Sequence, residues 1–401
     1  MANVSSSNGL EKRPKLRFPD FNEPWSIYKA EELFKNVADK NHPTETVLTI
    51  IQGKGTLPRE RAGRNIHYDD SSLANYKKVE QGDFIIHLRS FEGGLEMANE
   101  DGIVSPAYTI LRCKKPHSSL FYEAYFHTDE FINHILSKSV EGIRDGRQIS
   151  YEAFKWLGLP YCDVSEQEKI AQLFCTLSRR IEKQQQMVDA LKKYKRGVIQ
   201  QVFTGRKGTR KACYPEWQQS SLGEYFTEQT IRTSNTPSTP LVSLTVEDGI
   251  TPKTERYYRE FLVTKEGENY KMIKPGWFAY NPMNAHLGAI APNHLGYTAA
   301  VSGYYNIFSV NEPDTICFWE EYLTSYSMLI HYKLIATGSL IEKQRVHYSQ
   351  FVRIRRCLPS VGEQKHLSKL FETLNKKIAN AESTERQLVG MRVSLLQQLF
   401  I

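Results

Sequence analysis

Residues 198–203 read Val-Ile-Gln-Gln-Val-Phe, and residues 395–400 read Leu-Leu-Gln-Gln-Leu-Phe. The two stretches lie 197 residues apart, and the same offset places Glu166-Gln167 on Glu363-Gln364. A repeat of this length exceeds the period of about 20–50 residues that defines solenoid units. It predicts two copies of one module, joined head to tail, and a binding partner that has two parts.

The residues before each repeated ending have the spacing of a long amphipathic helix. Apolar residues recur at alternating steps of three and four, which is the heptad rule of a coiled coil. In the two copies these seam positions are Ile170, Leu173, Leu177, Ile181, Val188, Leu191, Val198 and Val202, and Leu367, Leu370, Leu374, Ile378, Ala381, Leu388, Leu395 and Leu399. At 1.5 Å per residue, roughly 37 residues give a rod of about 55 Å.

The narrow width of this stripe indicates a helical partner, and the other copy is the obvious one. Lys195 and Arg392 occupy equivalent seam positions near the C-terminal ends of the two helices. Antiparallel pairing separates these two cations, whereas parallel pairing in register sets them side by side, so we expect antiparallel helices. The alternative, in which each helix only packs on its own globular domain, stays open.

The repeat extends upstream of the helices with an offset that drifts between 192 and 197. Residues 25–34 match 217–226, and residues 47–59 match 241–253. Short β-rich runs alternate there with Gly and Pro turns and with a few helical patterns, which indicates an α+β fold. The predicted domains are residues 1–158, a long helix over 159–205, a second domain over 206–356 and a second long helix over 357–401.

Composition narrows the function without deciding it. A net charge of +7 and a pI of about 8.9 permit a polyanionic partner but do not require one. The N-terminus has no apolar core of a signal peptide, and no apolar run reaches the roughly 18 residues of a membrane span. The cysteines and histidines have no metal-ligand spacing. Gly53-Lys54-Gly55 begins like a phosphate-binding loop but continues as Thr-Leu-Pro-Arg, without the helix start that such a loop needs.

Basic and amide side chains occur in corresponding loops of the two copies, after the first strand and after Phe84 or Phe278. Arginine binds guanine edges or phosphates, and lysine neutralises phosphates. The alternative is that these are solvated loops with ordinary surface charge and no binding role. The loop frames match while their tips differ, as expected of two readers of different sequences. The candidate DNA-binding residues are Lys54, Arg59, Arg61, Arg64, Arg89, Ser90, Lys253, Arg256, Tyr257, Asn281 and Asn284. The candidate partner-docking residues, on the helix faces outside the seam, are Phe174, Met187, Tyr194 and Phe371.

The chain resembles the DNA-specificity (S) subunit of type I restriction–modification enzymes over nearly its whole length. The resemblance rests on Arg17-Phe18-Pro19 followed by Trp25, on Gly-Ile-Val-Ser-Pro-Ala-Tyr at 102–108, and on the run from 191 to 203 that ends in Gln-Gln-Val-Phe. In the second copy, residues 363–367 (Glu-Gln-Lys-His-Leu) depart from the usual Lys-Ile at the helix start.

The resemblance implies two target-recognition domains separated by two long helices, which form an antiparallel coiled coil with pseudo-two-fold symmetry. Each domain of such a subunit reads one half of a bipartite double-stranded DNA target. The helices act as a ruler and dock two methyltransferase subunits, and restriction/translocase subunits join that core. The subunit has no catalytic site, cofactor or metal of its own; S-adenosylmethionine, ATP and Mg belong to its partners. A bacterial or archaeal cytoplasm is the implied location, with no membrane partner.

Two other functions remain as alternatives. The first is a coiled-coil adaptor without a direct DNA role. The second is a solitary methyltransferase or nuclease, against which the missing cofactor loop argues.

Overall fold

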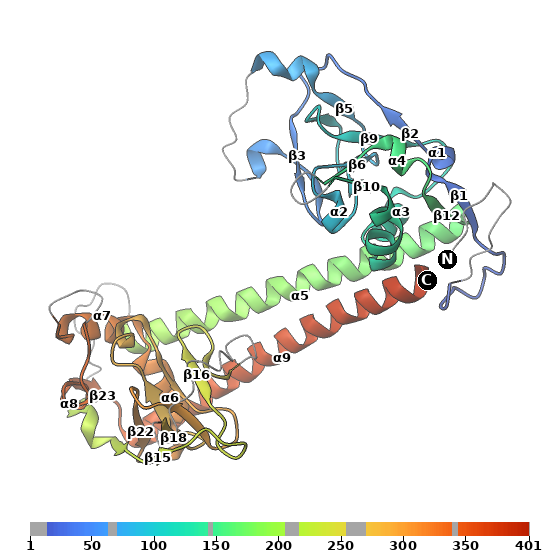
Figure 1. Cartoon of the computed structure of the whole chain (residues 1–401). Helices are drawn as coiled ribbons and strands as arrows, with labels where there is room; N and C mark the ends of the chain where they lie inside the picture. The colour runs from blue at the N-terminus through green and yellow to red at the C-terminus, as the bar shows by residue number, and fades with distance from the viewer. Residues whose placement is uncertain are drawn as a thin grey trace. The chain divides into compact units, whose positions relative to one another are not determined.

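The computed structural model of the 401-residue chain describes residues 14–62, 70–142, 147–204, 216–253, 270–338 and 344–400. The chain divides into two compact units. Unit 1 consists of Met1–Gln185 and Ser383–Ile401, and unit 2 consists of Gln186–Glu382. Two long helices, α5 (Val164–Thr204) and α9 (Val361–Phe400), each contribute residues to both units (Figure 1).

Unit 1 combines short strands with short helices. Its strands are β1 (Ser26–Lys29), β2 (Phe34–Val37), β3 (Leu48–Ile51), β4 (Gly55–Pro58), β5 (Lys77–Val79), β6 (Phe84–Ile86), β7 (Glu96–Met97), β8 (Gly102–Val104), β9 (Thr109–Cys113), β10 (Val140–Glu141), β11 (Gln148–Ile149) and β12 (Gly158–Tyr161). Its helical segments, besides parts of α5 and α9, are α1 (Ala30–Leu33), η1 (Arg59–Arg61), η2 (Asp70–Asn75), α2 (Ser90–Gly93), α3 (Ser119–Phe126), η3 (Glu130–Ile135), η4 (Leu136–Ser139) and α4 (Tyr151–Phe154).

Unit 2 has the same mixture of elements. Its strands are β13 (Gln218–Ser221), β14 (Phe226–Gln229), β15 (Arg232–Thr233), β16 (Val242–Thr245), β17 (Gly249–Pro252), β18 (Tyr270–Ile273), β19 (Phe278–Tyr280), β20 (Ile290–Pro292), β21 (Ala299–Ser302), β22 (Asn306–Val310) and β23 (Arg355–Leu358). Its helical segments, besides parts of α5 and α9, are η6 (Leu222–Glu224), η9 (Ala285–Leu287), η10 (Pro313–Thr315), α6 (Ile316–Leu323), α7 (Tyr326–Ile335) and α8 (Tyr348–Phe351).

The four-stranded sheets of the two units have the same strand order. A four-stranded antiparallel sheet is ordered β2-β9-β6-β7 in unit 1 and β14-β22-β19-β20 in unit 2. The β3–β4 hairpin pairs Ile51 with Gly55, and the β16–β17 hairpin pairs Thr245 with Gly249, at the same register. The architecture is therefore a duplicated mixture of helices and strands with two long helices, in agreement with the repeat in the sequence.

Most predicted seam positions of the two long helices are buried or partly buried. In α5 the less exposed positions recur at steps of three and four, and they include two polar residues, Gln184 and Lys195. Within unit 1, Phe174 near the start of α5 stacks on Phe400 at the end of α9, with ring centroids 6.1 Å apart. Leu370, which the heptad pattern placed in the seam, is 42% exposed, because its neighbour Phe371 is the residue that is buried.

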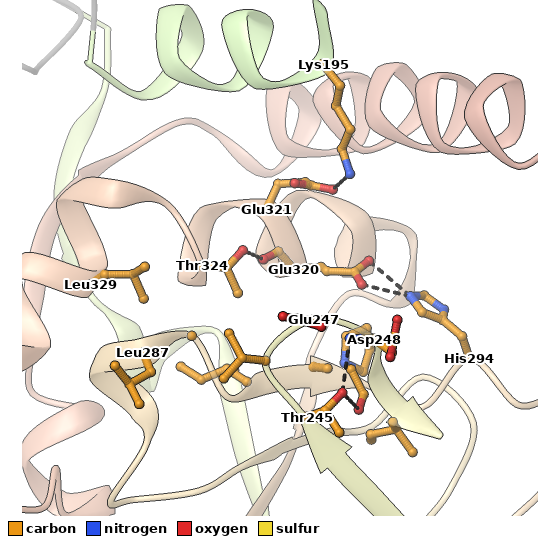
Figure 2. Close-up of a pocket in the computed structure, with 17 residues that line it drawn as sticks. Lys195, Thr245, Glu247, Asp248, Leu287, His294, Glu320, Glu321, Thr324 and Leu329 are labelled. Atoms are coloured by element: carbon orange, nitrogen blue, oxygen red, sulfur yellow. Dashed lines mark hydrogen bonds and ion pairs between the residues drawn. The ribbon is translucent and has the colours of Figure 1, made fainter. Parts of the chain in front are cut away.

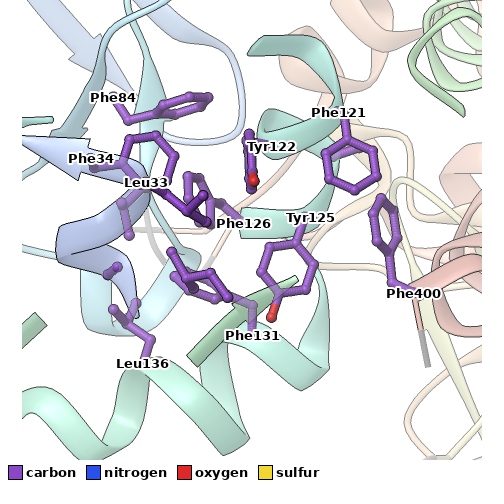
Figure 3. Packing of buried hydrophobic residues seen from close by; sticks show 14 of the residues in the cluster. Leu33, Phe34, Phe84, Phe121, Tyr122, Tyr125, Phe126, Phe131, Leu136 and Phe400 are labelled. Atoms are coloured by element: carbon purple, nitrogen blue, oxygen red, sulfur yellow. The ribbon is translucent and has the colours of Figure 1, made fainter. Parts of the chain in front are cut away.

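Phe400 closes the aromatic core of unit 1. Its ring lies 5.2 Å from that of Phe121 and 5.5 Å from that of Tyr125, both on α3 (Figure 3). It also lies 6.1 Å from the ring of Trp25. All of these side chains are almost completely buried. Phenylalanine and tyrosine in such edge and tilted contacts stabilise a core beyond the area that they bury. The last turn of α9 is thus an integral part of the unit 1 core.

Phe203 has the equivalent place in unit 2. Its ring contacts those of Phe318 and Tyr322 on α6 and that of Phe371 on α9, at centroid distances of 5.8, 5.0 and 5.9 Å. Phe318 and Tyr322 correspond to Phe121 and Tyr125 at the offset of 197. The repeated Gln-Gln-aliphatic-Phe ending therefore has the same structural role in both copies. Its phenylalanine packs against α3 in unit 1 and against α6 in unit 2.

The glutamate of each repeated Glu-Gln pair ties its long helix to the segment that precedes the first strand of the same unit. The buried carboxylate of Glu166 accepts hydrogen bonds from the Arg17 guanidinium at 2.7 and 2.8 Å and from the Trp25 indole at 3.0 Å. In unit 2, the Trp217 indole donates to Glu363 at 3.2 Å. A carboxylate in the first turn of a helix also interacts favourably with the positive end of the helix dipole.

Among the residues that the structure describes, none of the helices combines the length and the apolarity that a bilayer crossing requires.

Truncation of Phe400 tests the role of the last helical turn. We expect Phe400→Ala to lower the free energy of unfolding by about 3–5 kcal/mol, because it leaves a cavity among Trp25, Phe121 and Tyr125. Val393→Ala is the matched control: Val393 is 49% exposed on the same helix, and its truncation should change stability by less than about 0.5 kcal/mol. Urea denaturation followed by tryptophan fluorescence measures both, and equal effects would contradict this role for Phe400.

Candidate nucleic-acid interface

Unit 1 presents a basic turn between β3 and β4. Lys54 is exposed at its tip, and the Lys54 amide donates to the carbonyl of Ile51 at 2.9 Å. The side-chain amide of Asn99 donates to the carbonyls of Lys54 and Thr56 at 2.8 and 2.9 Å. The backbone of the turn is therefore well fixed, while the Lys54 ammonium group extends into solvent.

Two further predicted arginines follow this hairpin on η1. Arg61 is exposed, and Arg59 is partly buried close to Tyr108, where its charge lowers the tyrosine pKa against a larger upward effect of burial. Arg64 lies outside the described residues. Of the basic side chains near this hairpin that the structure describes, Lys54 and Arg61 are the better exposed.

The loop after β6 brings a second basic group beside the turn. The Arg89 side chain is 74% exposed, and its guanidinium lies 4.0 Å from the Glu92 carboxylate. A Cβ atom added to Gly93 would collide with the side chain of Gln52, so α2, which follows Arg89 directly, packs against the β3–β4 turn. The structure thus brings α2, which follows Arg89, close to the turn that carries Lys54.

Ser90 corrects an expectation. Its side chain is completely buried, and its hydroxyl oxygen accepts a hydrogen bond from the His87 amide at 2.9 Å. Serine at this place closes the turn before α2, because its hydroxyl bonds to a nearby backbone amide. Ser90 is therefore a structural residue of the loop and has no surface with which to contact DNA.

Unit 2 builds the same loops with different chemistry. The β16–β17 turn carries the exposed acids Glu247 and Asp248 where unit 1 carries Lys54. Lys253 follows β17 and is partly exposed. The predicted residues Arg256 and Tyr257 lie outside the described residues.

The loop after β19 contains the two predicted asparagines. The side-chain oxygen of Asn281 accepts from the Met283 amide at 3.0 Å, and the Asn281 carbonyl accepts from the Asn284 amide at 3.1 Å. Asn281 therefore shapes the loop, whereas Asn284 is exposed. The equivalent positions in unit 1 are His87 and Ser90, and they form a similar closed turn.

The predicted docking residues separate into two pairs. Met187 and Tyr194 are 55% and 61% exposed on α5. Phe174 and Phe371 are 4% and 0% exposed, because each packs on a phenylalanine of the other long helix within its own unit. The expectation that Phe174 and Phe371 lie on a free helix face is wrong.

A pocket of about 480 Å³ lies in unit 2 beside the β16–β17 turn and α6 (Figure 2). Its acidic side chains are Glu247, Asp248, Glu320 and Glu321. Glu320 binds His294 at 3.0 Å, and Glu321 binds Lys195 of α5 at 2.5 Å. An acidic lining repels phosphate groups, so this pocket is unsuited to a nucleic-acid backbone.

The sequence pattern explained Lys195 only as a polar break in the seam, whereas the structure assigns it a partner in α6. Burial raises the pKa of Glu321, and the charge of Lys195 opposes this shift. A hydrogen bond to Glu320 raises the pKa of His294 against the lowering effect of burial. Nothing in the periodicity could reveal the Lys195–Glu321 pair, because the two residues lie on elements far apart in the chain.

Within the described ranges, no group of three or more His, Cys, Asp or Glu side chains is arranged to hold a metal ion.

Comparison with known proteins gives a structural match without a sequence match. No protein-family model and no curated protein sequence matched the chain. The crystal structure of a type I restriction–modification system S subunit from M. genitalium aligns with a TM-score of 0.59 at 13% identity, covering 97% of this chain and 99% of that chain. The present chain therefore has the fold of this S subunit.

Two further solved structures are similar. One is a chain from a solved structure that concerns complex assembly and conformational transition of the type I R-M system. It aligns with a TM-score of 0.52 at 14% identity, covering 94% of this chain and 97% of that chain. The HsdS subunit from Thermoanaerobacter tengcongensis aligns with a TM-score of 0.48 at 14% identity, covering 94% of this chain and 96% of that chain.

The Lys195–Glu321 pair makes a pH-dependent prediction. Lys195→Met leaves the buried Glu321 carboxylate without its cation, so the folded-state pKa of Glu321 should rise further above 4.5. A carboxyl group whose pKa is raised by folding destabilises the fold when it is ionised. We therefore expect a loss of about 2–3 kcal/mol at pH 8 that shrinks as the pH falls through the raised pKa.

Chemical denaturation at pH 5 and pH 8 measures this difference. The double variant Lys195→Met/Glu321→Gln is the control and should recover most of the stability at pH 8, because no charge remains buried. A loss for Lys195→Met that is equal at both pH values would argue against the pair.

Proposed function

We propose that this chain is the DNA-specificity subunit of a type I restriction–modification complex, in which each unit reads one half of a bipartite DNA target. The observation that carries the proposal is the fold shared with the M. genitalium S subunit over 97% of this chain. The duplication within the chain supports it, because two units of one fold with different loop tips suit a target whose halves differ in sequence.

The two long helices serve in this proposal as an antiparallel coiled coil that spaces the two recognition domains. The support comes from each unit taken by itself. In unit 1 the start of α5 packs on the end of α9, through Phe174 and Phe400. In unit 2 the end of α5 packs on the start of α9, through Phe203 and Phe371. A helix of 41 residues is about 60 Å long, which equals roughly 18 base pairs of DNA.

Base and phosphate contacts are assigned to the exposed loop residues. In unit 1 these are Lys54, Arg61 and Arg89, whose charges neutralise phosphates or bind guanine. In unit 2 they are Lys253 and Asn284, since an asparagine amide bonds to adenine through its donor and acceptor. The different chemistry of the two loop sets is the proposed source of an asymmetric target.

The partners are two methyltransferase subunits and the restriction/translocase subunits, and the chain itself performs no reaction. Met187 and Tyr194 are large, apolar and more than half exposed on α5, which suits a protein interface. S-adenosylmethionine, ATP and Mg are proposed to act in the partner subunits, and the complex is proposed to work in the cytoplasm.

One observation favours the alternative of a coiled-coil adaptor without a DNA role. The β16–β17 turn of unit 2 carries Glu247 and Asp248, and these acids repel the DNA backbone wherever they face it. The adaptor and the specificity subunit differ in one outcome, which is whether the chain binds duplex DNA at all.

Selection from a random duplex library tests the proposal. The full chain, with its methyltransferase partner, is expected to enrich one split motif and to lose affinity steeply as salt rises, because lysine and arginine displace counterions from phosphates. Lys54→Ala/Arg89→Ala should weaken binding by roughly 10-fold or more, as expected for about 1–3 kcal/mol lost per specific contact. Lys376→Ala, which removes an exposed lysine that binds Glu372 on α9, is the control and should bind normally. Failure to enrich any motif, with the partner present, would support the adaptor.

Exchange of one unit tests the assignment of one unit to one half. Replacing residues 25–150 with the equivalent segment of a subunit of different specificity should change one half of the selected motif and leave the other half and the spacer intact. The unexchanged chain is the reference. A change in both halves would contradict independent reading by the two units.

A further inference from the structure

A buried carboxylate holds the β3–β4 turn of unit 1. Glu96, on β7, is completely buried, and its two oxygens accept hydrogen bonds from the Gly53 and Gly55 amides at 2.7 and 2.9 Å. The same carboxylate binds Nε2 of His127 at 3.3 Å. These contacts join the turn that carries Lys54 to a sheet strand and to the end of α3.

The turn is built as an anion site that the chain fills itself. Gly53 and Gly55 both have φ of +74°, a left-handed conformation that favours glycine. A Cβ atom on Gly55 would lie 2.6 Å from the carbonyl oxygen of Met97, so the turn approaches β7 too closely for any side chain. Amides aimed at one point from such a turn form a concavity that binds anions, and Glu96 occupies it.

The hydrogen bonds of His127 require a charged ring. Nδ1 lies 2.8 Å from the carbonyl oxygen of Glu123, and Nε2 lies 3.3 Å from Glu96. The Glu123 carbonyl oxygen can only accept a hydrogen bond, and the same holds for the Glu96 carboxylate when it is ionised. Both ring nitrogens must then carry a proton, so the ring is an imidazolium. The pKa directions agree. Burial is the largest single effect on His127 and lowers its pKa, but the bond to Glu96, the charges of Glu96 and Glu123 and the bond to the Glu123 carbonyl together raise it more. Burial raises the pKa of Glu96, but His127 and the two glycine amides together lower it more.

In unit 2 the equivalent turn packs on an alanine in the place of the buried carboxylate. Ala291 pairs with Ala279 as Glu96 pairs with Ile85, so alanine stands where unit 1 has the carboxylate. A Cβ atom on Gly249 would lie 3.0 Å from the Cβ atom of Ala291, so this turn packs directly on the strand. Thr324 replaces the histidine, and its hydroxyl donates to the Glu320 carbonyl instead.

We propose that Glu96 and His127 are positioning residues that hold the Lys54 turn in its binding conformation, and that this ion pair makes the conformation of the turn in unit 1 sensitive to pH. The effect on the turn follows from unit 1 alone. The effect on DNA rests on the function proposed above, and it predicts that one half of the target is read in a pH-dependent way.

Other charged groups near the pair do not replace it. His87 accepts a hydrogen bond from the Arg89 amide at Nδ1, and burial lowers its pKa, so it stays neutral where His127 is charged. Glu92 acts electrostatically on His87, and Arg392 of α9 acts on Glu123, whose pKa is raised by burial. His127 is therefore the cation that bonds directly to Glu96 among the described groups.

The direction of the pH effect follows from the two pKa shifts. The contribution of Glu96, whose pKa is lowered, is present above its ordinary value of 4.5 and is lost as the pH falls through the lowered value. The contribution of His127, whose pKa is raised, is present below 6.5 and is lost as the pH rises through the raised value. The pair is complete between these limits and weakens on the alkaline side.

Hydrogen exchange of the full chain between pH 5 and pH 8 tests the pair. After correction for intrinsic rates, the segment 50–58 should be protected best near pH 6 and should lose protection several-fold as the pH rises through the raised pKa of His127. Glu96→Gln should reduce protection of 50–58 roughly 10-fold at pH 6 and lower the His127 pKa in an NMR titration, because an amide nitrogen then faces backbone donors.

Two further variants separate positioning from folding. His127→Gln keeps a neutral donor towards Glu96 and should retain protection that no longer depends on pH. If Glu96→Gln unfolds the unit, this variant still decides the question. Glu141→Gln, at an exposed acid on β10, is the control and should behave as the unmodified chain.

Unchanged protection of 50–58 in Glu96→Gln, or an unchanged pH profile in His127→Gln, would overturn the inference. On the selected DNA target, affinity should fall several-fold from pH 6 to pH 8 in the unmodified chain but not in His127→Gln, and equal pH profiles would likewise overturn it. If no DNA target is found, the proposed function fails, while the exchange data still decide the role of the pair.

Discussion

Each unit of this chain depends on one phenylalanine supplied by the last turn of a long helix. Phe400 packs on Phe121 and Tyr125 in unit 1, and Phe203 packs on Phe318 and Tyr322 in unit 2. The unit 1 core therefore joins residues near the start of the chain to residues at its end. Loss of one large ring from such a core leaves a cavity that the neighbouring side chains fill only in part, so each unit depends on its phenylalanine for stability.

This constraint links the helices to the loops that we propose as the DNA-binding surface. In unit 1, α3 carries Phe121 and Tyr125 towards Phe400, and His127 follows directly after this helix. His127 in turn binds Glu96, which holds the turn of Lys54. A continuous set of contacts within one unit thus connects the helix end to the exposed loop.

The two units show how a duplicated fold acquires different surfaces. The strand order of the four-stranded sheet and the hairpin register are the same in both, because they depend on backbone pairing and on apolar residues that face the cores. The exposed residues of the turn can vary once its backbone is fixed. The backbone is fixed by the Glu96–His127 ion pair in unit 1 and by direct packing on Ala291 in unit 2. The exposed tips differ accordingly, with Lys54 in one and Glu247 and Asp248 in the other.

The sequence by itself determined the duplication, the two long helices and the mixture of helices and strands, because apolar periodicity and an internal repeat are properties of the chain alone. It also predicted the loops on which candidate contacts lie. Only the tertiary structure decided which side chains are available there: it buried Ser90, Phe174 and Phe371, and it paired Lys195 with Glu321 and Glu96 with His127. The physical reason is that burial and ion pairing depend on which distant segments meet, and no local pattern records that.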